Sequence, residues 1–507
     1  MDRNSQGATE HGVIVVGGGP SGLVVAAELA QAGVDVVVFE RRTGVVQSRA
    51  GTILPRVLEL LDARGWADEI IARAHEILPN PLFRTHMWAG MKPVEWHHLD
   101  SRFGYRLVLP QNITEEVLIK RALECGVTIR RGMTVETVRQ DDTGVEVTAV
   151  DAEGVRRSVR AAYAVGCDGG RSVVREQAGI ASTGHPATFT GIVADVRIDN
   201  PWAEGRRIVD NDRGWLASFP FGEGVTRFNL VHADRMHADP AEPVTVEEVR
   251  TCLREILETD LDFASLHWAS RFSDATRIAE RFAQGRVLLV GESSRIHYPA
   301  SGVGMNFCIQ DGFNLGWKLA AVVNGHADPS LLDSYDAERR PVAEELLRSV
   351  AAQCAVQFAF SPQAVVFKRW FESVVMPVPE VNRRLALELN GLALAYPTAP
   401  DAGPLAGRRM PDLELRLPSG TTTVGALLRG QHMLVLDLTG DELLRGLAYA
   451  AAPVDVVSGV PVRLPEDLRT ATTVLVRPDA YVARAWTGGE QEADVKAEIQ
   501  RWLAHAR

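Results

Sequence analysis

The sequence predicts an α/β fold of several domains, and three observations support this prediction. The first 40 residues contain a strand, a glycine-rich turn, a helix and a second strand, in that order. Between about residues 181 and 276 the pattern changes to short strands separated by polar turns, which is typical of an antiparallel sheet. The chain of 507 residues is also longer than one ordinary domain.

Residues 12–41 form the first unit of this pattern. The run Val13–Val16 suits a buried parallel strand, and the glycines after it have the spacing G-x-G-x-x-G. Gly17 allows a sharp turn, Gly19 lets a pyrophosphate approach the backbone, and Gly22 lets the following helix pack close to the strand. That helix directs its free N–H groups towards the same phosphate.

The second strand of the unit, residues 34–39, ends at Glu40, where a carboxylate would hold ribose hydroxyls. Because the strand, the turn, the helix, the second strand and the acid occur together, the sequence predicts a Rossmann-like unit that binds a dinucleotide. The candidate binding residues in this unit are Gly17, Gly19, Pro20, Ser21, Gly22, Glu40 and Arg41.

Composition and charge limit the partners of this chain. Apolar residues make up 46% and charged residues 23%, which are ordinary values for a water-soluble globular protein. The net charge of −11 argues against nucleic acid as a partner. No apolar run reaches the length of a bilayer, and the polar N-terminus does not resemble a secretory signal, so we expect a cytoplasmic protein without a membrane partner.

The cysteines predict a reducing compartment and no metal site. No C-x-x-C motif occurs, and the cysteines are odd in number and scattered, which favours small core residues over a disulfide framework or a zinc site. They are Cys125, Cys167, Cys252, Cys308 and Cys354.

Changes in pattern along the chain predict domain boundaries. We expect three segments of the dinucleotide-binding domain, two segments of a β-sheet substrate domain inserted between them, a Pro/Gly-rich linker, and a small C-terminal α/β domain. In chain order these are residues 1–72 (binding), 73–110 (substrate), 111–180 (binding), 181–276 (substrate), 277–396 (binding, with a helical segment), 397–411 (linker) and 412–507 (C-terminal).

The C-terminal domain has its own alternating pattern. Strands are expected at 432–438, 454–457, 473–477 and 481–486, and helices at 441–451 and 490–506.

Two further loops lie where parallel strands end, which is the usual place for ligands in such sheets. In the first loop, Asp168 and Gly169 permit a tight turn that leaves a carboxylate beside a bound group, although a plain turn capped by Ser172 has the same pattern. In the second loop, Gly302 and Gly304 let backbone N–H groups point into a site at the start of a helix. Taken alone, this second pattern also fits a glycine loop that simply enters a helix.

Together the three stretches resemble the class A flavoprotein monooxygenases, the para-hydroxybenzoate hydroxylase-like enzymes. The matching motifs are the N-terminal turn, the Asp168-Gly169 motif with its S-x-V-R ending at Arg175, and the loop Pro299-x-x-Gly302-x-Gly304-x-Asn306. The chain also matches the helices of that family, and most resembles its hydroxylases of aromatic polyketides, which act in angucycline and anthracycline biosynthesis. The helical matches are Asp311–Leu319, Leu332–Tyr335 and Glu338–Pro341.

The resemblance implies a fold and a cofactor. It implies a GR2-type FAD-binding Rossmann-like domain, a β-sheet substrate domain and a thioredoxin-like C-terminal domain. Residues 412–507 contain no cysteine, so that domain has no thioredoxin-type redox role. The further residues implied to bind FAD are Arg49, Gln111, Asp168, Gly169, Glu292, Pro299, Gly302, Val303, Gly304, Met305 and Asn306.

The resemblance also implies an activity. NADPH or NADH reduces the FAD transiently, O₂ adds to give a flavin C4a-hydroperoxide, and one oxygen atom passes to a polycyclic phenol, which makes the protein a monooxygenase of secondary metabolism. We expect a monomer or a homodimer. Baeyer–Villiger insertion or oxidative rearrangement of a polyketide quinone is the alternative outcome. The candidate catalytic residues are Arg271, His297 and Pro299, with Tyr105 as a further candidate for a base.

Four residues depart from the family pattern. Glu292 stands where the family has Asp, and Arg295 stands where His is common. Ser301 and Val303 replace residues that are often Gly and Gln. These departures support a further alternative, a flavin-impaired homologue that acts as a binding partner.

Overall fold

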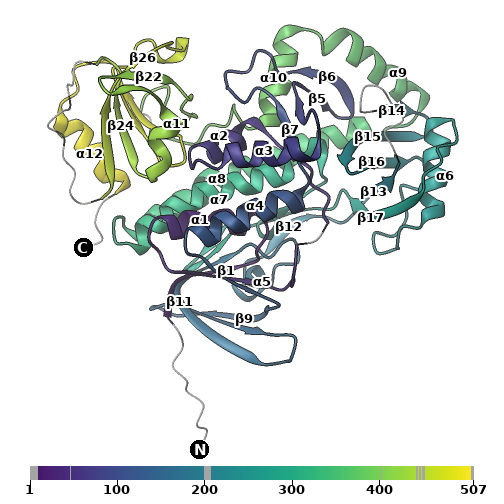
Figure 1. The fold of residues 1–507 in the computed structure, drawn as a ribbon, viewed down its shortest axis with the longest axis horizontal. Helices are drawn as coiled ribbons and strands as arrows, with labels where there is room; N and C mark the ends of the chain where they lie inside the picture. The colour runs from purple at the N-terminus through teal and green to yellow at the C-terminus, as the bar shows by residue number, and fades with distance from the viewer. Residues whose placement is uncertain are drawn as a thin grey trace, which may run out of the picture.

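The computed structural model of the protein describes residues 10–45, 47–198, 207–399, 401–440, 444, 447 and 452–503. Figure 1 shows a central body of sheet and helices, with the sheet around β14 to β17 at one end and a separate C-terminal lobe at the other. Both expectations for the fold class are confirmed, since the structure is α/β and the segment around residues 181–276 forms an antiparallel sheet.

The dinucleotide-binding unit is built on an eight-stranded sheet in which the order β19-β20-β11-β1-β2-β8 forms the main path. Its five strands from β20 to β8 pair in parallel, and the prediction of a buried parallel strand at Val13–Val16 is confirmed. β9 and β10 extend from β11 as an antiparallel hairpin. The strands are β1 (Glu10–Val16), β2 (Val36–Glu40), β8 (Thr128–Arg131), β9 (Thr134–Gln140), β10 (Val145–Val150), β11 (Arg156–Gly166), β19 (Ala283–Gln284) and β20 (Val287–Leu289).

Two long helices of this unit, α1 (Pro20–Gln31) and α7 (Gly304–Val323), pack backbone against backbone. A Cβ on Gly316 would lie 2.5 Å from Cβ of Glu28, and one on Gly312 would lie 3.2 Å from the carbonyl oxygen of Ser21. Glycine at these two positions, one helical turn apart, therefore allows the close approach of the two helices.

The substrate domain contains a five-stranded antiparallel sheet in the order β14-β15-β16-β13-β17. One face is covered by α6 (Val246–Leu257), which buries its apolar side on that face (Figure 1). The other face carries aromatic residues such as Trp215 and Phe272 into a second core. The strands are β13 (Thr190–Arg197), β14 (Arg207–Asn211), β15 (Gly214–Gly222), β16 (Val225–His232) and β17 (Ser265–Ser273).

Shorter strands and further helices complete the body of the molecule. The strands are β3 (Thr52–Ile53), β4 (Leu82–Phe83), β5 (Thr85–Trp88), β6 (Met91–Glu95), β7 (Arg106–Val108), β12 (Ser182–His185), β18 (Thr276–Ala279) and β21 (Arg295–Ile296). The helices are α2 (Pro55–Asp62), α3 (Ala67–Ile77), α4 (Gln111–Glu124), α5 (Val173–Gln177), α8 (Asp333–Gln357), α9 (Pro362–Trp370) and α10 (Pro379–Asn390).

The C-terminal domain contains a mixed four-stranded sheet in the order β25-β24-β27-β28 and a smaller sheet of β23, β22 and β26. The four predicted strands and the final helix are present, whereas β22 and β23 were not predicted. The helix predicted at 441–451 lies outside the described residues, apart from Leu444 and Leu447. The elements are β22 (Glu414–Leu417), β23 (Gly420–Thr423), α11 (Val424–Leu427), β24 (Met433–Asp437), β25 (Val454–Ser458), β26 (Val460–Pro461), β27 (Thr473–Val476), β28 (Val482–Trp486) and α12 (Glu492–Trp502).

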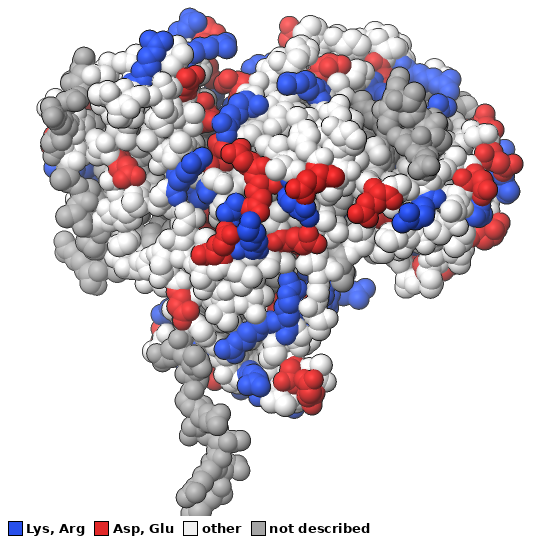
Figure 2. All heavy atoms as spheres, viewed as in Figure 1, with Lys and Arg blue, Asp and Glu red and all other residues white. Residues whose placement is uncertain are grey.

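The surface of the body carries charges of both signs. On the face shown in Figure 2, acidic and basic side chains lie close together near its centre. Lys120 and Arg121 of α4 pair with Glu69 of α3. Among the described helices, no single one is long and apolar enough to span a membrane, although the pair Pro329–Gln357 and Pro362–Val375, bent by 117°, has that length and composition together.

Candidate active site

The turn between β1 and α1 has the geometry that its three glycines predict. Gly17 has φ +106°, and a Cβ there would lie 2.3 Å from the carbonyl oxygen of Cys167. A Cβ on Gly22 would lie 2.0 Å from the carbonyl oxygen of Gly17. At Gly19 a Cβ would have no atom within 4 Å, so the first turn of α1 borders open space into which its N–H groups can donate.

Glu40 lies at the end of β2 beside this turn. One carboxylate oxygen accepts from the N–H of Gly18 at 2.7 Å, and the other accepts from the backbone and the side chain of Arg42 at 2.8 and 3.0 Å. Burial raises the pKa of Glu40, but the hydrogen bonds from Arg42 and Gly18 outweigh it and leave the pKa below its ordinary value. The contact to Glu40 is made by Arg42, whereas Arg41, the residue proposed from the sequence, is exposed.

Asp168 lies just after the end of β11, which is the neighbour of β1 in the sheet. Its carboxylate accepts from the hydroxyl of Ser172 at 2.5 Å and from the N–H of Val174 at 3.1 Å, while Ser172 also caps α5. Burial raises the pKa of Asp168. The capped-turn interpretation therefore accounts for these contacts of its carboxylate. Gly169 has φ +81°, and a Cβ there would have no atom within 4 Å, so the space beside the turn is open.

The three loops predicted from the sequence meet at the carboxyl end of the sheet. Gly17 touches Cys167, and a Cβ on Gly291 would lie 3.1 Å from the hydroxyl of Ser21. A Cβ on Gly170 would lie 2.6 Å from the side chain of Ile296. The first turn, the Asp168 turn and residues 291–304, which we call the flavin loop, therefore lie side by side.

Two departures from the family pattern begin the flavin loop. Glu292 is exposed in a short 3₁₀ turn. Arg295 is buried and donates to Asp311 of α7 at 2.6 Å, and the second oxygen of Asp311 accepts from Arg339 of α8 at 2.7 Å. Arg295 thus ties the flavin loop to the helices beneath it, through an ion pair that a histidine could form only when protonated.

The middle of the flavin loop is braced against strands of both domains. Ser301 has φ +50°, and its hydroxyl lies 3.0 Å from the carbonyl oxygen of Met87. Asn306 is fully buried; its side chain accepts from the N–H of Leu54 at 2.8 Å and donates to the carbonyls of Thr52 and Gly302 at 3.0 and 3.2 Å. The Asn306 side chain thus ties the end of the loop at Gly302 to the backbone of residues 52–54.

The loop ends at the N-terminus of α7, where Gly302, Gly304 and Met305 are half-buried and Val303 is buried. Pro299, also half-buried, precedes the short 3₁₀ turn there. His297 lies beside this helix end, since a Cβ on Gly304 would be 3.5 Å from its ring.

The protonation of His297 follows from its partner and its burial. Its Nδ1 donates to the carbonyl of Tyr298 at 2.7 Å, because a carbonyl only accepts, and Nε2 is therefore the unprotonated atom. Burial lowers the pKa of His297 to about 4, so the ring is neutral at neutral pH and is a weak proton acceptor.

Arg49 and Gln111 lie on the segments that lead to β3 and α4. Arg49 is exposed, and its carbonyl accepts from Arg227 at 2.7 Å. The side chain of Gln111 donates to Glu115 at 2.7 Å, and its N–H donates to the carbonyl of Ala50 at 3.1 Å. The backbone thus brings these two candidates close together.

Arg271 does not lie at this site. Its guanidinium donates to Glu248 of α6 at 2.9 and 3.1 Å, on the outer face of the substrate sheet. The next residue, Phe272, points the opposite way and packs on Tyr298 of the flavin loop, with ring centroids 5.5 Å apart. The prediction of Arg271 as a catalytic residue is therefore corrected: successive side chains of a strand point to opposite faces, and Arg271 lies on the face away from the flavin loop. Tyr105 packs on Phe103, and burial raises its pKa.

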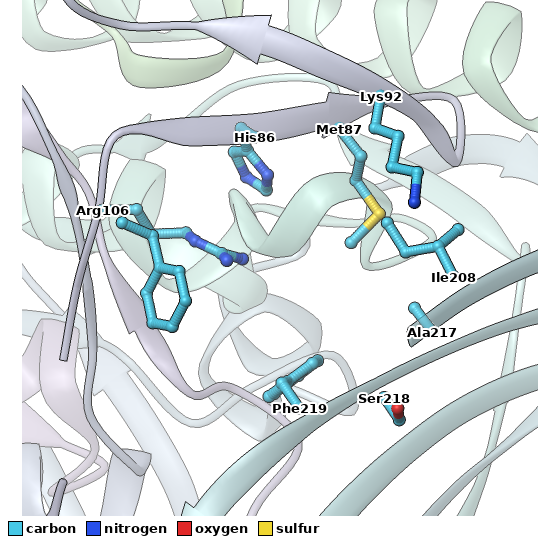
Figure 3. Close-up of a pocket in the computed structure, with 9 residues that line it drawn as sticks. His86, Met87, Lys92, Arg106, Ile208, Ala217, Ser218 and Phe219 are labelled. Atoms are coloured by element: carbon cyan, nitrogen blue, oxygen red, sulfur yellow. The ribbon is translucent and has the colours of Figure 1, made fainter. Parts of the chain in front are cut away.

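A cavity lies between the short strands of the first substrate segment and the inner face of the five-stranded sheet (Figure 3). Its volume is about 10 Å³, which is room for about one water molecule. Figure 3 shows His86 and Arg106 directed into it. The lining residues are Phe83, His86, Met87, Lys92, Arg106, Ile208, Ala217, Ser218 and Phe219.

His86 joins this cavity to the flavin loop. The residue is buried, and its Nε2 donates to the carbonyl of Ser301 at 2.7 Å. Arg106 is also buried, and its guanidinium lies over the ring of Phe83, 5.3 Å from the centroid. Neither residue was predicted from the sequence, because they stand on separate short strands with no local motif.

Comparison with known proteins covers almost the whole chain. Residues 10–350 match the family model described as "FAD binding domain", and residues 403–506 match that described as "Aromatic-ring hydroxylase, C-terminal". A 12-dehydrotetracycline 5-monooxygenase/anhydrotetracycline 6-monooxygenase of Streptomyces rimosus is 39% identical over 94% of this chain and 95% of its own. A dialkyldecalin synthase of Streptomyces rugosporus is 32% identical over 97% of this chain and 99% of its own.

The fold also matches a solved structure over its full length. The anhydrotetracycline hydroxylase of Streptomyces rimosus superposes with a TM-score of 0.88 and 35% identity, over 98% of this chain and all of the other.

Proposed function

The chain belongs to the FAD-dependent aromatic-ring hydroxylases, and we propose that it hydroxylates a polycyclic aromatic polyketide in the cavity lined by His86 and Arg106. It is a monooxygenase that depends on FAD and NAD(P)H. Bound FAD would supply the redox chemistry: electrons from NAD(P)H would activate O₂, so that one oxygen atom enters the substrate and the other leaves as water.

The residues at the carboxyl end of the sheet fit FAD. The open space beside Gly19 and Gly169, at the start of α1, suits a pyrophosphate. Glu40 lies beside the turn, at the position proposed for the adenosine ribose. We assign the ring end to the N-terminus of α7, where the positive end of the helix dipole would stabilise a reduced, anionic flavin. The buried side chain of Val303 excludes water from this end.

The observation that carries the proposal is the direct contact between cavity and flavin loop. His86 donates to the Ser301 carbonyl, and the hydroxyl of Ser301 lies 3.0 Å from the carbonyl oxygen of Met87, another cavity residue. A substrate held in this cavity therefore lies next to the loop that we assign to the flavin ring, on the inner face of the substrate sheet.

The lining of the cavity suits an ionisable aromatic compound. Phe83, Met87 and Phe219 offer apolar contacts, and the Arg106 guanidinium favours the phenolate form of a bound phenol, since an opposite charge nearby lowers its pKa. A phenolate ring is the more electron-rich and reacts faster with an electrophilic oxygen. Because the volume of the cavity is so small, the side chain of Met87 or of the exposed Lys92 must move when a polycyclic substrate enters.

The test uses purified protein, NADPH, labelled O₂ and a set of polycyclic phenols. We expect a yellow protein, NADPH oxidation stimulated by substrate, and a product that carries one labelled oxygen atom. Arg106→Met should raise KM for an ionisable phenol about tenfold, as loss of a charged hydrogen-bond partner does, and much less for its methyl ether. Arg84→Met, at an exposed arginine that does not line the cavity, is the matched control.

Two other outcomes are distinguished by the same experiment. Labelled hydrogen peroxide as the only oxygen product, with every phenol tried, would refute hydroxylation. A ring-expanded or rearranged labelled product, identified by NMR, would indicate the Baeyer–Villiger alternative. Because one relative is a dialkyldecalin synthase, formation of a decalin without incorporation of labelled oxygen is the second candidate function.

A further inference from the structure

The C-terminal domain docks on the rest of the chain through residues 477–481, the turn between β27 and β28, which we call the docking turn. Arg477 donates to both oxygens of Glu338 in α8, at 2.6 and 2.9 Å. Arg56 of α2 and Arg64, just after α2, donate to carbonyl oxygens of the docking turn at 2.8 and 2.9 Å. All four of these side chains are buried, so the contact is an internal part of the molecule.

The next residue of α8, Arg339, is linked to the flavin loop through Asp311 of α7. The guanidinium of Arg339 is fully buried and donates to Asp311 at 2.7 Å and to the hydroxyl of Tyr396 at 2.9 Å. The other oxygen of Asp311 accepts from Arg295 of the flavin loop at 2.6 Å. A third N–H contact of Arg339, at 3.4 Å, goes to the carbonyl of Phe307 in the first turn of α7.

Tyr396 connects this arginine to the C-terminal domain. Its ring stacks on that of Tyr481 in the docking turn, with centroids 4.2 Å apart, and its N–H donates to the carbonyl of Gly407 at 2.8 Å. A continuous series of buried contacts therefore runs from the docking turn through Tyr396, Arg339 and Asp311 to the flavin loop.

We propose that the C-terminal domain is a clamp on the FAD site, and that Arg339 is the positioning residue through which it acts. A seated domain keeps Arg339 directed at Asp311 and at the first turn of α7, and so fixes the flavin loop. An unseated domain leaves a buried cation short of a partner, which loosens the loop and weakens FAD retention. The proposal gives a role to a domain that has no cysteine for redox chemistry.

A matched pair of variants tests this proposal. Tyr396→Phe keeps the stacked ring and removes the hydroxyl that accepts from Arg339. Tyr481→Phe removes a buried hydroxyl for which the described residues offer no hydrogen-bond partner, and it is the control. We expect Tyr396→Phe to raise the Kd for FAD about tenfold, the size expected for a lost acceptor of a charged donor, and Tyr481→Phe to leave it unchanged.

A second measurement needs no cofactor. Trypsin cuts after arginine, so the rate of cleavage after the buried Arg295 in FAD-free protein reports the opening of the flavin loop. This rate should rise in Tyr396→Phe and not in Tyr481→Phe. If Tyr396→Phe does not fold, Arg477→Lys perturbs the same clamp from the docking turn and should give the same two changes.

The proposal is overturned if the Tyr396 and Tyr481 variants have equal FAD affinities and equal cleavage rates. It is also overturned if Tyr396→Phe lowers only the melting temperature of FAD-free protein, since that result indicates a purely structural contact. Both measurements omit substrate and NADPH, so they test the clamp separately from the proposed hydroxylation.

Discussion

Replacing Gly19 by alanine should remove FAD binding without unfolding the protein, because the space at Gly19 is open on the protein side. Gly19 has φ −80° and ψ −178°, which alanine adopts freely, and its Cβ would meet no atom within 4 Å. Alanine restricts the backbone of the unfolded chain, which stabilises the folded state by about 0.4–1 kcal/mol. Alanine is also a poorer N-cap than glycine, which costs about as much, so the net change in the free energy of unfolding should be small. The methyl group would stand where a pyrophosphate approaches, and we expect a Kd for FAD about 100-fold higher.

Gly22→Ala is the contrasting variant three residues along the same turn. Its Cβ would lie 2.0 Å from the carbonyl oxygen of Gly17, so α1 must move away from β1, at a cost of about 3 kcal/mol. The assay is urea unfolding of FAD-free protein, combined with FAD titration by quenching of flavin fluorescence. The reasoning is refuted if Gly19→Ala unfolds as early as Gly22→Ala, or if it binds FAD as tightly as the unaltered protein.

Three further predictions concern buried ionisable side chains. Asp195 is fully buried and accepts from Arg227 at 2.6 and 2.8 Å, so Asp195→Asn should cost about 3–5 kcal/mol in urea unfolding; a loss below about 1 kcal/mol would contradict this. Burial raises the pKa of Glu338, but Arg477 and Lys318 outweigh it and lower the pKa to about 2. Because this folded-state pKa is depressed, the contribution of Glu338 to stability is complete above about pH 4.5 and is lost as the pH falls through about 2. The melting temperature of the unaltered protein should therefore fall across this pH range. The melting temperature of Glu338→Gln should fall less, because the glutamine does not titrate. His297 is neutral at neutral pH because burial lowers its pKa to about 4, so His297→Asn should leave the pH dependence of kcat unaltered near pH 6.5, and disappearance of a limb there would show that His297 titrates.

The first turn could be predicted from sequence because each of its glycines meets a local requirement. The positive φ at Gly17, the close contact at Gly22 and the open space at Gly19 all arise within one strand–turn–helix unit. Motif spacing records such local requirements directly. The departure at Arg295 was also visible in the sequence, but its partner Asp311 is fixed by the packing of the flavin loop on α7.

Residues outside local motifs could not be placed in the same way. Arg271 was misplaced because a one-residue change of register moves a side chain to the opposite face of a strand, and only the pairing of β17 with β13 decides that face. His86 and Arg106 meet because β5 and β7 are brought together by the fold, and no spacing between them reports this. Asp168 carries the family motif, yet its carboxylate binds its own turn.

The glycine contact between α1 and α7 has a consequence for the choice of cofactor. Because Gly312 and Gly316 let the two helices touch, their N-termini stand at a fixed separation, and neither can move to meet a shorter ligand. The two helices therefore set the spacing of the ligand groups that bind at their N-termini. A molecule that engages both helix ends must carry a phosphate and a ring at that spacing, as the flavin half of FAD does, and the adenosine half is left to bind beside Glu40.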